Sequence, residues 1–235
     1  MKKFLAIASV LLLAACAKSY PVATGLTATG SCDGTTFTSD EGLVFRIVED
    51  KSTEPMGALE RVYITYDVVS RIGNEYEIRL ISWTKPLVKG WIKKADITDE
   101  DAIGHDPIRI TYGWTGGGYL NLNLDLSFKK ESTTKHVVNL VLANPPVQED
   151  TLRLAIRHNG ASEALTTDIL NQDTDGQWNK TYAFGSSLVC FPTEGLLPEG
   201  TDQIPFAITG EWYSQNAETR EWTLKESRVT GLLKR

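Results

Sequence analysis

The strongest constraint on the fold is a strict alternation of leucine with short polar residues between residues 120 and 126. Leucine occupies every even position of this segment, and asparagine or aspartate occupies every odd position. Successive side chains of a β-strand point to opposite faces of its sheet, so a period of two indicates a strand with one apolar face. We expect the leucines to face a core, and Asn121, Asn123 and Asp125 to form a solvated polar row on a one-sided sheet.

Similar apolar patterns recur along most of the chain and predict further strands. These cover residues 43–48, 62–68, 76–80, 108–114, 136–142, 152–158, 188–191, 204–213 and 222–224. The turn sequences Gly73-Asn74, Gly116-Gly117-Gly118 and Asn159-Gly160 separate several of them and are typical of β-hairpins. No segment has the period of an amphipathic helix longer than two turns. The chain is therefore predicted to be all-β, as a sandwich or a barrel.

An acidic stretch interrupts the pattern and suggests two domains. Between Lys93 and Asp106 the alternation stops and four acidic residues crowd together. Such stretches are typical of domain boundaries. We expect one domain over residues 31–103 and a second over residues 104–235. Residues 16–30 are small and polar, which predicts a tether.

The N-terminus has the features of a bacterial lipoprotein precursor. Two lysines precede an apolar run that is shorter than the roughly 20 residues of a membrane-spanning helix, and the run ends in Leu13-Ala14-Ala15-Cys16. These features predict a cleaved signal peptide over residues 1–15. The last four residues resemble a lipobox, which implies a diacylglyceryl group on the Cys16 sulfur and a fatty acid such as palmitate on the new amino group. The alternative is soluble secretion with a free cysteine.

A lipid at Cys16 would hold the protein permanently at a membrane, because each buried methylene contributes about 0.8 kcal/mol. Residue 17 is alanine, whereas an aspartate here resembles an inner-membrane retention signal. This favours attachment to the outer membrane and leaves open whether the protein faces the periplasm or the exterior.

The net charge argues against a nucleic-acid partner. Removing residues 1–15 takes away two lysines and no acidic residue, so the formal charge goes from −6 to −8. Nucleic-acid binding depends on basic residues that neutralise phosphates, and an acidic chain lacks that footprint. We expect contact with a membrane through the lipid, and a glycan or a protein as partner.

One motif is similar to the front half of a calcium-binding loop. Asn171, Asp173 and Asp175 alternate ahead of Gly176, and oxygen ligands at alternate positions with a glycine bend suit Ca²⁺. However, Tyr182 stands where an EF-hand has its bidentate glutamate, and no flanking helices are predicted. A surface turn is the favoured interpretation, with calcium binding as the alternative.

The other candidate motifs give no catalytic, metal or cofactor site. The glycine run 116–118 precedes a predicted strand, whereas a phosphate cradle needs a helix there. His105, His136 and His158 are not spaced as metal ligands, and Ser186-Ser187 lacks the glycines of a nucleophile elbow. No cofactor is expected.

The remaining cysteines and the tryptophans leave their roles open. Cys32 and Cys190 could form a disulfide in an oxidising envelope. Because they fall in different predicted domains, we favour two buried free thiols. Six tryptophans could fill cores or form an exposed platform for sugars or peptides.

Several segments resemble the NigD-like lipoproteins of anaerobic Gram-negative bacteria. They are Asp40-Glu41-Gly42-Leu43, Arg61–Tyr66, Gly113–Asn121, Lys135–Val141 and Leu152–Asn159. The resemblance runs from about residue 36 to the C-terminus. It implies an N-terminal OB-like barrel followed by an antiparallel β-sandwich, and the family name comes from a bacteriocin-linked operon. It supplies no catalytic or binding residues.

The sequence therefore predicts an outer-membrane-anchored lipoprotein that acts as a non-catalytic binding module. The alternatives are a bacteriocin-immunity-like protective protein and a glycan hydrolase whose carboxylate pair the sequence does not single out. Clustered exposed tryptophans would favour binding. Two close carboxylates with a raised pKa would favour the enzyme.

Overall fold

The computed structural model describes residues 23–73, 75–173 and 175–234, and strands dominate them. The all-β prediction is confirmed. The predicted signal peptide and Cys16 lie outside the described residues. No helix in the described part of the chain is long and apolar enough to cross a membrane.

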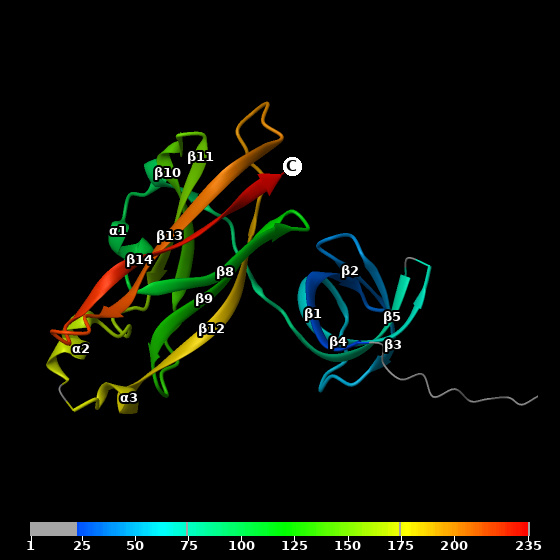
Figure 1. Cartoon of the computed structure of the whole chain (residues 1–235), viewed down its shortest axis with the longest axis horizontal. Helices are drawn as coiled ribbons and strands as arrows, with labels where there is room; N and C mark the ends of the chain where they lie inside the picture. The colour runs from blue at the N-terminus through cyan, green and yellow to red at the C-terminus, as the bar shows by residue number, and fades with distance from the viewer. Residues whose placement is uncertain (1–22, 74, 174, 235) are drawn as a thin grey trace, which may run out of the picture.

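The first unit is a closed barrel of five strands (Figure 1). In barrel order these are β1 (Ala23–Asp33), β2 (Thr36–Ser39), β3 (Val44–Asp50), β5 (Glu75–Thr84) and β4 (Ala58–Ile72). Neighbouring strands are antiparallel except β3 and β5, which run parallel. β4 closes the barrel against β1. Phe37, Ile64, Ile78 and Leu80 are fully buried in its interior. Five is the strand number of an OB-fold.

The second unit is a sandwich of two sheets, ordered β14-β13-β11-β10-β7 and β6-β12-β9-β8. Its strands are β6 (Leu87–Val88), β7 (Ile92–Lys93), β8 (Ile108–Gly116), β9 (Tyr119–Lys129), β10 (Val137–Gln148), β11 (Thr151–Asn159), β12 (Tyr182–Pro192), β13 (Gln203–Gln215) and β14 (Trp222–Lys234). Short helices are η1 (Lys94–Asp96), α1 (Glu100–Ile103), α2 (Thr167–Gln172) and α3 (Trp178–Thr181). Leu120, Leu122 and Leu124 are buried between the sheets, as the alternation predicts.

The sandwich is not purely antiparallel. β6 pairs with β12, β7 with β10 and β11 with β13, and all three pairs are parallel. The first two arise because β6 and β7 are short segments of the chain leaving the barrel, and each adds to the edge of one sheet.

This pairing corrects the predicted domain boundary. The chain enters the sandwich directly after β5, at residues 85–86, rather than between 103 and 104. The acidic stretch looked like a linker but is docked on the sandwich, where the Asn159 amide donates to the carbonyl oxygens of Asp101 (2.8 Å) and Ala102 (3.2 Å). The predicted tether is also too long, because β1 begins at Ala23.

A buried polar cluster joins the two units. The Arg61 guanidinium of β4, 3% exposed, donates to both carboxylate oxygens of Asp40, at 2.6 Å for Nη2–Oδ2. Nη2 also donates to Asn121 Oδ1 of β9 at 2.6 Å, and the guanidinium lies 4.6 Å from the Tyr119 ring centroid. Cys190 Sγ accepts from Arg61 Nε at 3.5 Å. These contacts hold the barrel against the outer face of the sheet that contains β9 and β12.

The glycine run at 116–118 is a hairpin turn, as predicted, and it has a second role. Gly117 and Gly118 have φ of +58° and +80°, a region that favours glycine. A Cβ on Gly116 would lie 2.6 Å from the Asp40 Cβ, and one on Gly117 would overlap Asp40 Oδ1. Because residues 116 and 117 have no side chains, Asp40 of the barrel can pack closely against the hairpin. Cys32 and Cys190 are buried free thiols.

Candidate binding site at the far end of the sandwich

The polar row of β9 is not a solvated surface, which corrects the expectation from its alternation. Asn121 is 0% exposed and Asp125 is 9% exposed, and Ser127 is fully buried. Asn121 lies under the barrel, in the cluster around Arg61. Ser127 hydrogen-bonds Tyr213 and the backbone N–H of Leu165. The barrel covers Asn121 and the segment around Leu165 covers Ser127, and both are distant from β9 in sequence. The alternation therefore shows which face the residues share and not what packs on that face.

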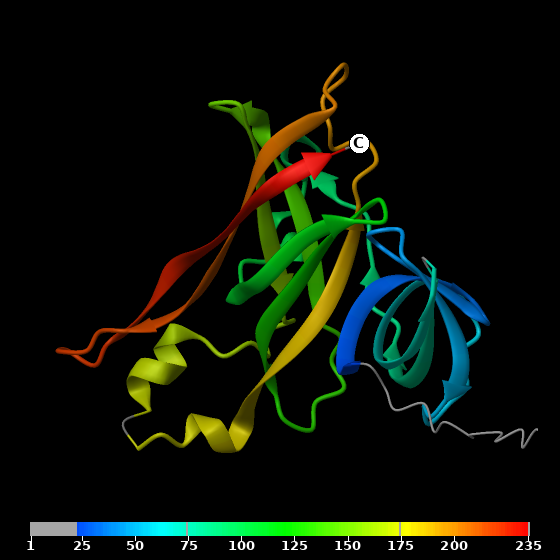
Figure 2. The same ribbon diagram turned by 45° about the vertical axis from the view of Figure 1, so that its right-hand side comes forward.

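Around Asp125 the same face opens into an aromatic pocket of about 260 Å³. The residues that line this pocket are Arg109, Asp125, Leu170, Trp178, Phe184, Trp212, Tyr213 and Trp222. Three of the six tryptophans of the chain therefore gather at one place. Leu170 of α2 and Trp178 of α3 contribute to the pocket. In Figure 2 these two helices, in olive yellow, are at the end of β12 far from the point where the blue barrel meets the sandwich.

The residues of the calcium-like motif hold two of these tryptophans. The Asn171 amide exchanges two hydrogen bonds with the Trp222 backbone, at 2.7 Å from the Trp222 N–H and 3.0 Å to its carbonyl. The Asp173 carboxylate accepts from the backbone N–H of Trp178. The described residues contain no group of three or more histidine, cysteine, aspartate or glutamate side chains that could hold a metal. The motif thus fastens the α2 segment to the start of β14 and to α3.

Phe184 of β12 is the centre of the ring cluster and remains 47% exposed. Its ring centroid lies 5.6 Å from that of Trp178, 5.4 Å from that of Trp212 and 6.0 Å from that of Tyr213. These separations and the tilted rings fall in the favourable range for aromatic pairs. The pocket therefore keeps large apolar ring surfaces facing solvent.

Arg109 and Asp125 supply the polar side of the pocket. Arg109 Nε donates to Asp125 Oδ2 at 3.1 Å, and the guanidinium lies 5.2 Å from the Trp212 ring centroid. Ser186 Oγ donates to the other carboxylate oxygen at 2.5 Å. Burial opposes ionisation of Asp125, but hydrogen bonds from Ser186 and Arg109 outweigh it and hold its pKa below the usual value. Asp125 is therefore charged and its charge is balanced locally.

Tyr213 fixes the base of the pocket. Its hydroxyl donates to the Leu165 carbonyl and lies 3.0 Å from Ser127 Oγ. Burial raises the pKa of Tyr213 strongly, so the phenol stays neutral. These buried hydrogen bonds fix the Tyr213 ring. The Trp212 ring packs against it, with 4.8 Å between the two ring centroids.

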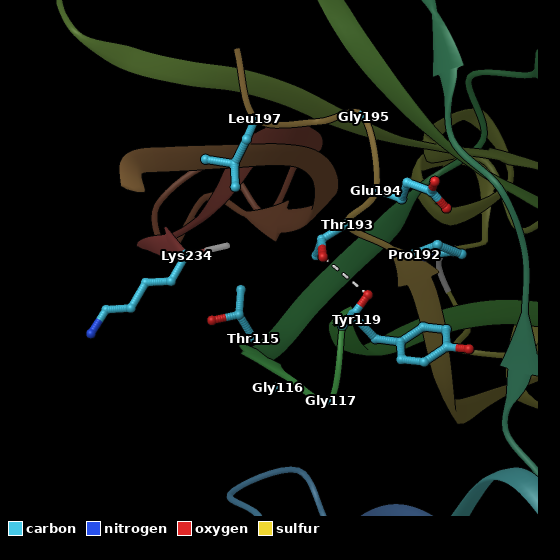
Figure 3. Close-up of a pocket in the computed structure, with 11 residues that line it drawn as sticks. Thr115, Gly116, Gly117, Tyr119, Pro192, Thr193, Glu194, Gly195, Leu197 and Lys234 are labelled. Carbon is cyan, nitrogen blue, oxygen red and sulfur yellow. Dashed lines mark hydrogen bonds between the residues drawn. The ribbon is translucent and has the colours of Figure 1, made fainter. Parts of the chain in front are cut away.

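A larger hollow of about 820 Å³ lies at the glycine hairpin (Figure 3). Its walls are residues 115–119, 192–195 and 197 with Lys234, and the Thr193 hydroxyl donates to the Gly118 carbonyl at 3.0 Å. In Figure 3 the Lys234 side chain points away from Tyr119. The polar groups here do not converge on a common point, and the aromatic pocket is the better candidate for a site.

The histidines meet in part. His136 Nδ1 and His158 Nε2 share a hydrogen bond of 2.9 Å, and the spacing of these histidines does not indicate this pair. His105 lies apart, 3.5 Å from the Glu100 carboxylate. The pair is backed by a contact of 3.3 Å from His158 Nδ1 to the Pro107 carbonyl, so it belongs to the packing of the sandwich.

Comparison with known proteins confirms the family resemblance. Residues 91–167 match the family model described as NigD-like C-terminal beta sandwich domain. The match begins next to β7, in agreement with the boundary seen in the structure. No curated protein matches the sequence.

Solved structures share the fold across both units. A NigD-like immunity protein from Bacteroides caccae is 18% identical, with a TM-score of 0.57 over 88% of this chain and 93% of its own. A protein of unknown function from Bacteroides vulgatus is 20% identical, with the same TM-score over 88% and 90%. A candidate lipoprotein from Bacteroides fragilis is 14% identical, with the same TM-score over 87% and 96%.

Proposed function

We propose that this protein is a non-catalytic binding module of the cell envelope, and that its ligand enters the aromatic pocket. The observation that carries the proposal is the gathering of Trp178, Trp212 and Trp222 around the exposed Phe184. Binding pockets combine mostly apolar and aromatic walls with a few placed polar groups. Arg109 and Asp125 are such groups.

The chemistry of the pocket favours binding over hydrolysis. A glycoside hydrolase needs two carboxyl groups, one of them protonated by a raised pKa. Among the described residues, Asp125 is the only one that brings a carboxyl group to the pocket, and its pKa is lowered. A group held charged by Arg109 and Ser186 is suited to accept hydrogen bonds from a ligand and not to donate a proton.

Attachment through Cys16 is part of the proposal. It is supported by the lipobox-like Leu13-Ala14-Ala15-Cys16 and by the likeness to the candidate lipoprotein from Bacteroides fragilis. The outer membrane is favoured by Ala17. Because β1 begins at Ala23, the barrel would lie within roughly 25 Å of the lipid at full extension of the chain. A fatty-acid analogue should label the wild type and not Cys16→Ser. Equal labelling of both would contradict the anchor.

A second candidate is an immunity-like protective role, and one observation favours it: a protein of the same fold is described as a NigD-like immunity protein. Such a role would also rest on binding, with a bacteriocin as the partner. Expression in a bacteriocin-sensitive strain should then shrink the zone of growth inhibition around a producing colony. An unchanged zone would remove this candidate.

Two arrays test binding at the pocket. One carries mono- to hexasaccharides of glucose, galactose, mannose, xylose and N-acetylglucosamine, and the other carries random dodecapeptides. We expect binding on one array and its loss in Trp212→Ala and Trp222→Ala. Trp114→Ala is the matched control, because Trp114 is half-buried and lines neither the aromatic pocket nor the hollow at the glycine hairpin. No binding on either array would contradict the proposed function.

A further inference from the structure

A second hollow of about 320 Å³ opens on the same sheet face, between the aromatic pocket and the barrel. We call it the junction groove. Its lining residues are Tyr63 and Thr84 from the barrel, Lys85 and Pro86 from the connection, and Leu87, Asn123, Ser186, Ser187 and Leu188 from the sandwich. Both units and the connection between them therefore contribute to its walls.

The junction groove and the aromatic pocket are adjacent parts of one surface. Ser186 lines the groove and donates to Asp125, which lines the pocket. Asn123 and Asp125 lie two positions apart on the same face of β9, a separation of about 7 Å along a strand. A ligand in the pocket that continues along the strand would thus reach Asn123.

Asn123 differs from its neighbours in the polar row because its side chain takes no part in the hydrogen bonds of the described fold. The side chains of Asn121, Asp125 and Ser127 all make hydrogen bonds. The Asn123 amide is half-buried and makes no hydrogen bond to any other part of the chain that the structure describes. It offers a donor and an acceptor on the groove floor. Leu87, 49% exposed, supplies an apolar wall.

The groove floor is formed by β9 and β12, the two inner strands of the order β6-β12-β9-β8. The backbone of β9 pairs with β12 on one side and with β8 on the other. β12 pairs with β6 only at Val189 and Cys190, so at Ser186–Leu188 its other edge has no backbone partner in the described chain. A peptide strand adds to a free sheet edge, so a peptide is the alternative occupant, and the dodecapeptide array tests it.

The side chains present match a sugar. A pyranose ring has C–H groups on its faces, which pack on aromatic rings, and hydroxyl groups around its rim, which both donate and accept. The rings of Trp212 and Phe184 meet the first requirement, and Asp125 and Asn123 meet the second. Arg109 is already paired with Asp125, so the charges of the pocket balance. In the groove, the exposed Lys85 has no ion pair within the described chain and offers a further donor to a sugar hydroxyl.

We propose that the aromatic pocket and the junction groove together bind a linear oligosaccharide. One sugar ring stacks in the pocket, and the next ring along the chain hydrogen-bonds Asn123 in the groove. This inference rests on the proposed function, since it names the ligand of the same pocket and adds a subsite to it.

The inference is tested by varying the length of the saccharide. Binding to the full mature protein is measured on the saccharide array and by calorimetric titration. Affinity should rise from mono- to trisaccharide. Asn123→Ala should lower the affinity for the trisaccharide about three- to tenfold, which is the effect of one or two neutral hydrogen bonds. It should leave the affinity for the monosaccharide unchanged. Thr230→Ala, an exposed residue on β14, is the control and should change neither.

Each contrary result separates this inference from the proposed function. Monosaccharide binding with no gain from chain length and no effect of Asn123→Ala would overturn the second subsite and leave the pocket as a sugar site. Binding of dodecapeptides alone, lost in Trp212→Ala, would overturn the saccharide and leave the binding function. No binding on either array would overturn both.

Discussion

Arg61 of the barrel and Asn121 of the sandwich are joined by a hydrogen bond of 2.6 Å, buried between the two units. Asp40 completes the cluster, and the glycine hairpin lies against it. Residues of three of the segments that resemble the NigD-like lipoproteins meet here: Asp40-Glu41-Gly42-Leu43, Arg61–Tyr66 and Gly113–Asn121. Their shared physical role is to hold the barrel against the sandwich, which also shapes the junction groove.

Removing the Arg61 guanidinium should strongly destabilise the protein. Arg61→Met would leave the Asp40 carboxylate buried without its cation, which costs about 3–5 kcal/mol. Arg61→Met combined with Asp40→Leu should recover part of this loss, because no unpaired charge remains. Urea unfolding of both variants measures it. A loss below about 1 kcal/mol for Arg61→Met would show that the cluster is not a structural contact.

The glycine hairpin offers a matched pair of substitutions. Gly117→Ala and Gly118→Ala both place alanine at a positive φ, at a cost of about 1–2 kcal/mol. A Cβ at 117 would also overlap Asp40, whereas one at 118 meets nothing within 4 Å. Gly117→Ala should therefore lower the free energy of unfolding further than Gly118→Ala. Equal losses would mean that the hairpin does not need the close approach of the barrel.

Two asparagines of one strand should respond differently to truncation. Asn121→Ala removes a partner of the buried Arg61 and should cost about 1–3 kcal/mol. Asn123→Ala removes an amide that makes no hydrogen bond within the described chain, and should change stability by less than about 0.5 kcal/mol. Thermal or urea unfolding compares them. Two small, equal effects would instead favour a solvated polar row.

This pair also shows how far the sequence predicts the structure. The alternation of residues 120–126 correctly identifies the strand and its core-facing leucines. It does not predict that the barrel covers Asn121 or that residues around Leu165 cover Ser127, because tertiary contacts leave no periodic signal. Composition misplaced the domain boundary for a similar reason. The acidic residues are typical of a linker, and only the fold brings Asn159 to their backbone.

The aromatic pocket could be anticipated only in part. Six tryptophans in one chain signal a platform or a core, but Trp178, Trp212 and Trp222 come from three separate elements. Asn171 and Asp173 belong to a pattern that suits Ca²⁺. Their actual partners are backbone groups of Trp222 and Trp178. A short polar motif has the same sequence whether it binds an ion or a main chain.

Stability should fall on mild acidification because of His158. Burial lowers the pKa of His158, and the adjacent His136 lowers it further, against an opposing effect of Asp106. The unfolded chain, with a histidine pKa near 6.5, then binds more protons than the folded one, so stability is full above about pH 6.5 and declines below it. Glu163, which also faces the pair, titrates at lower pH, since its pKa is lowered.

The free energy of unfolding measured between pH 7 and 5 tests this sign. It should decrease with falling pH in the wild type, by up to about 1.4 kcal/mol per pH unit. His158→Gln should show a shallower dependence over the same range. A wild-type stability that rises toward pH 5 would contradict the assignment of His158 as a buried neutral group.

Calorimetric titration of Trp212→Ala decides whether the aromatic pocket binds the ligand. Calorimetry with the best ligand from the arrays should show an affinity at least about tenfold lower in Trp212→Ala than in the wild type, which corresponds to about 1.4 kcal/mol. Trp114→Ala should bind as the wild type does. Unchanged affinity in Trp212→Ala, with the variant folded, would contradict the account and place the binding surface elsewhere.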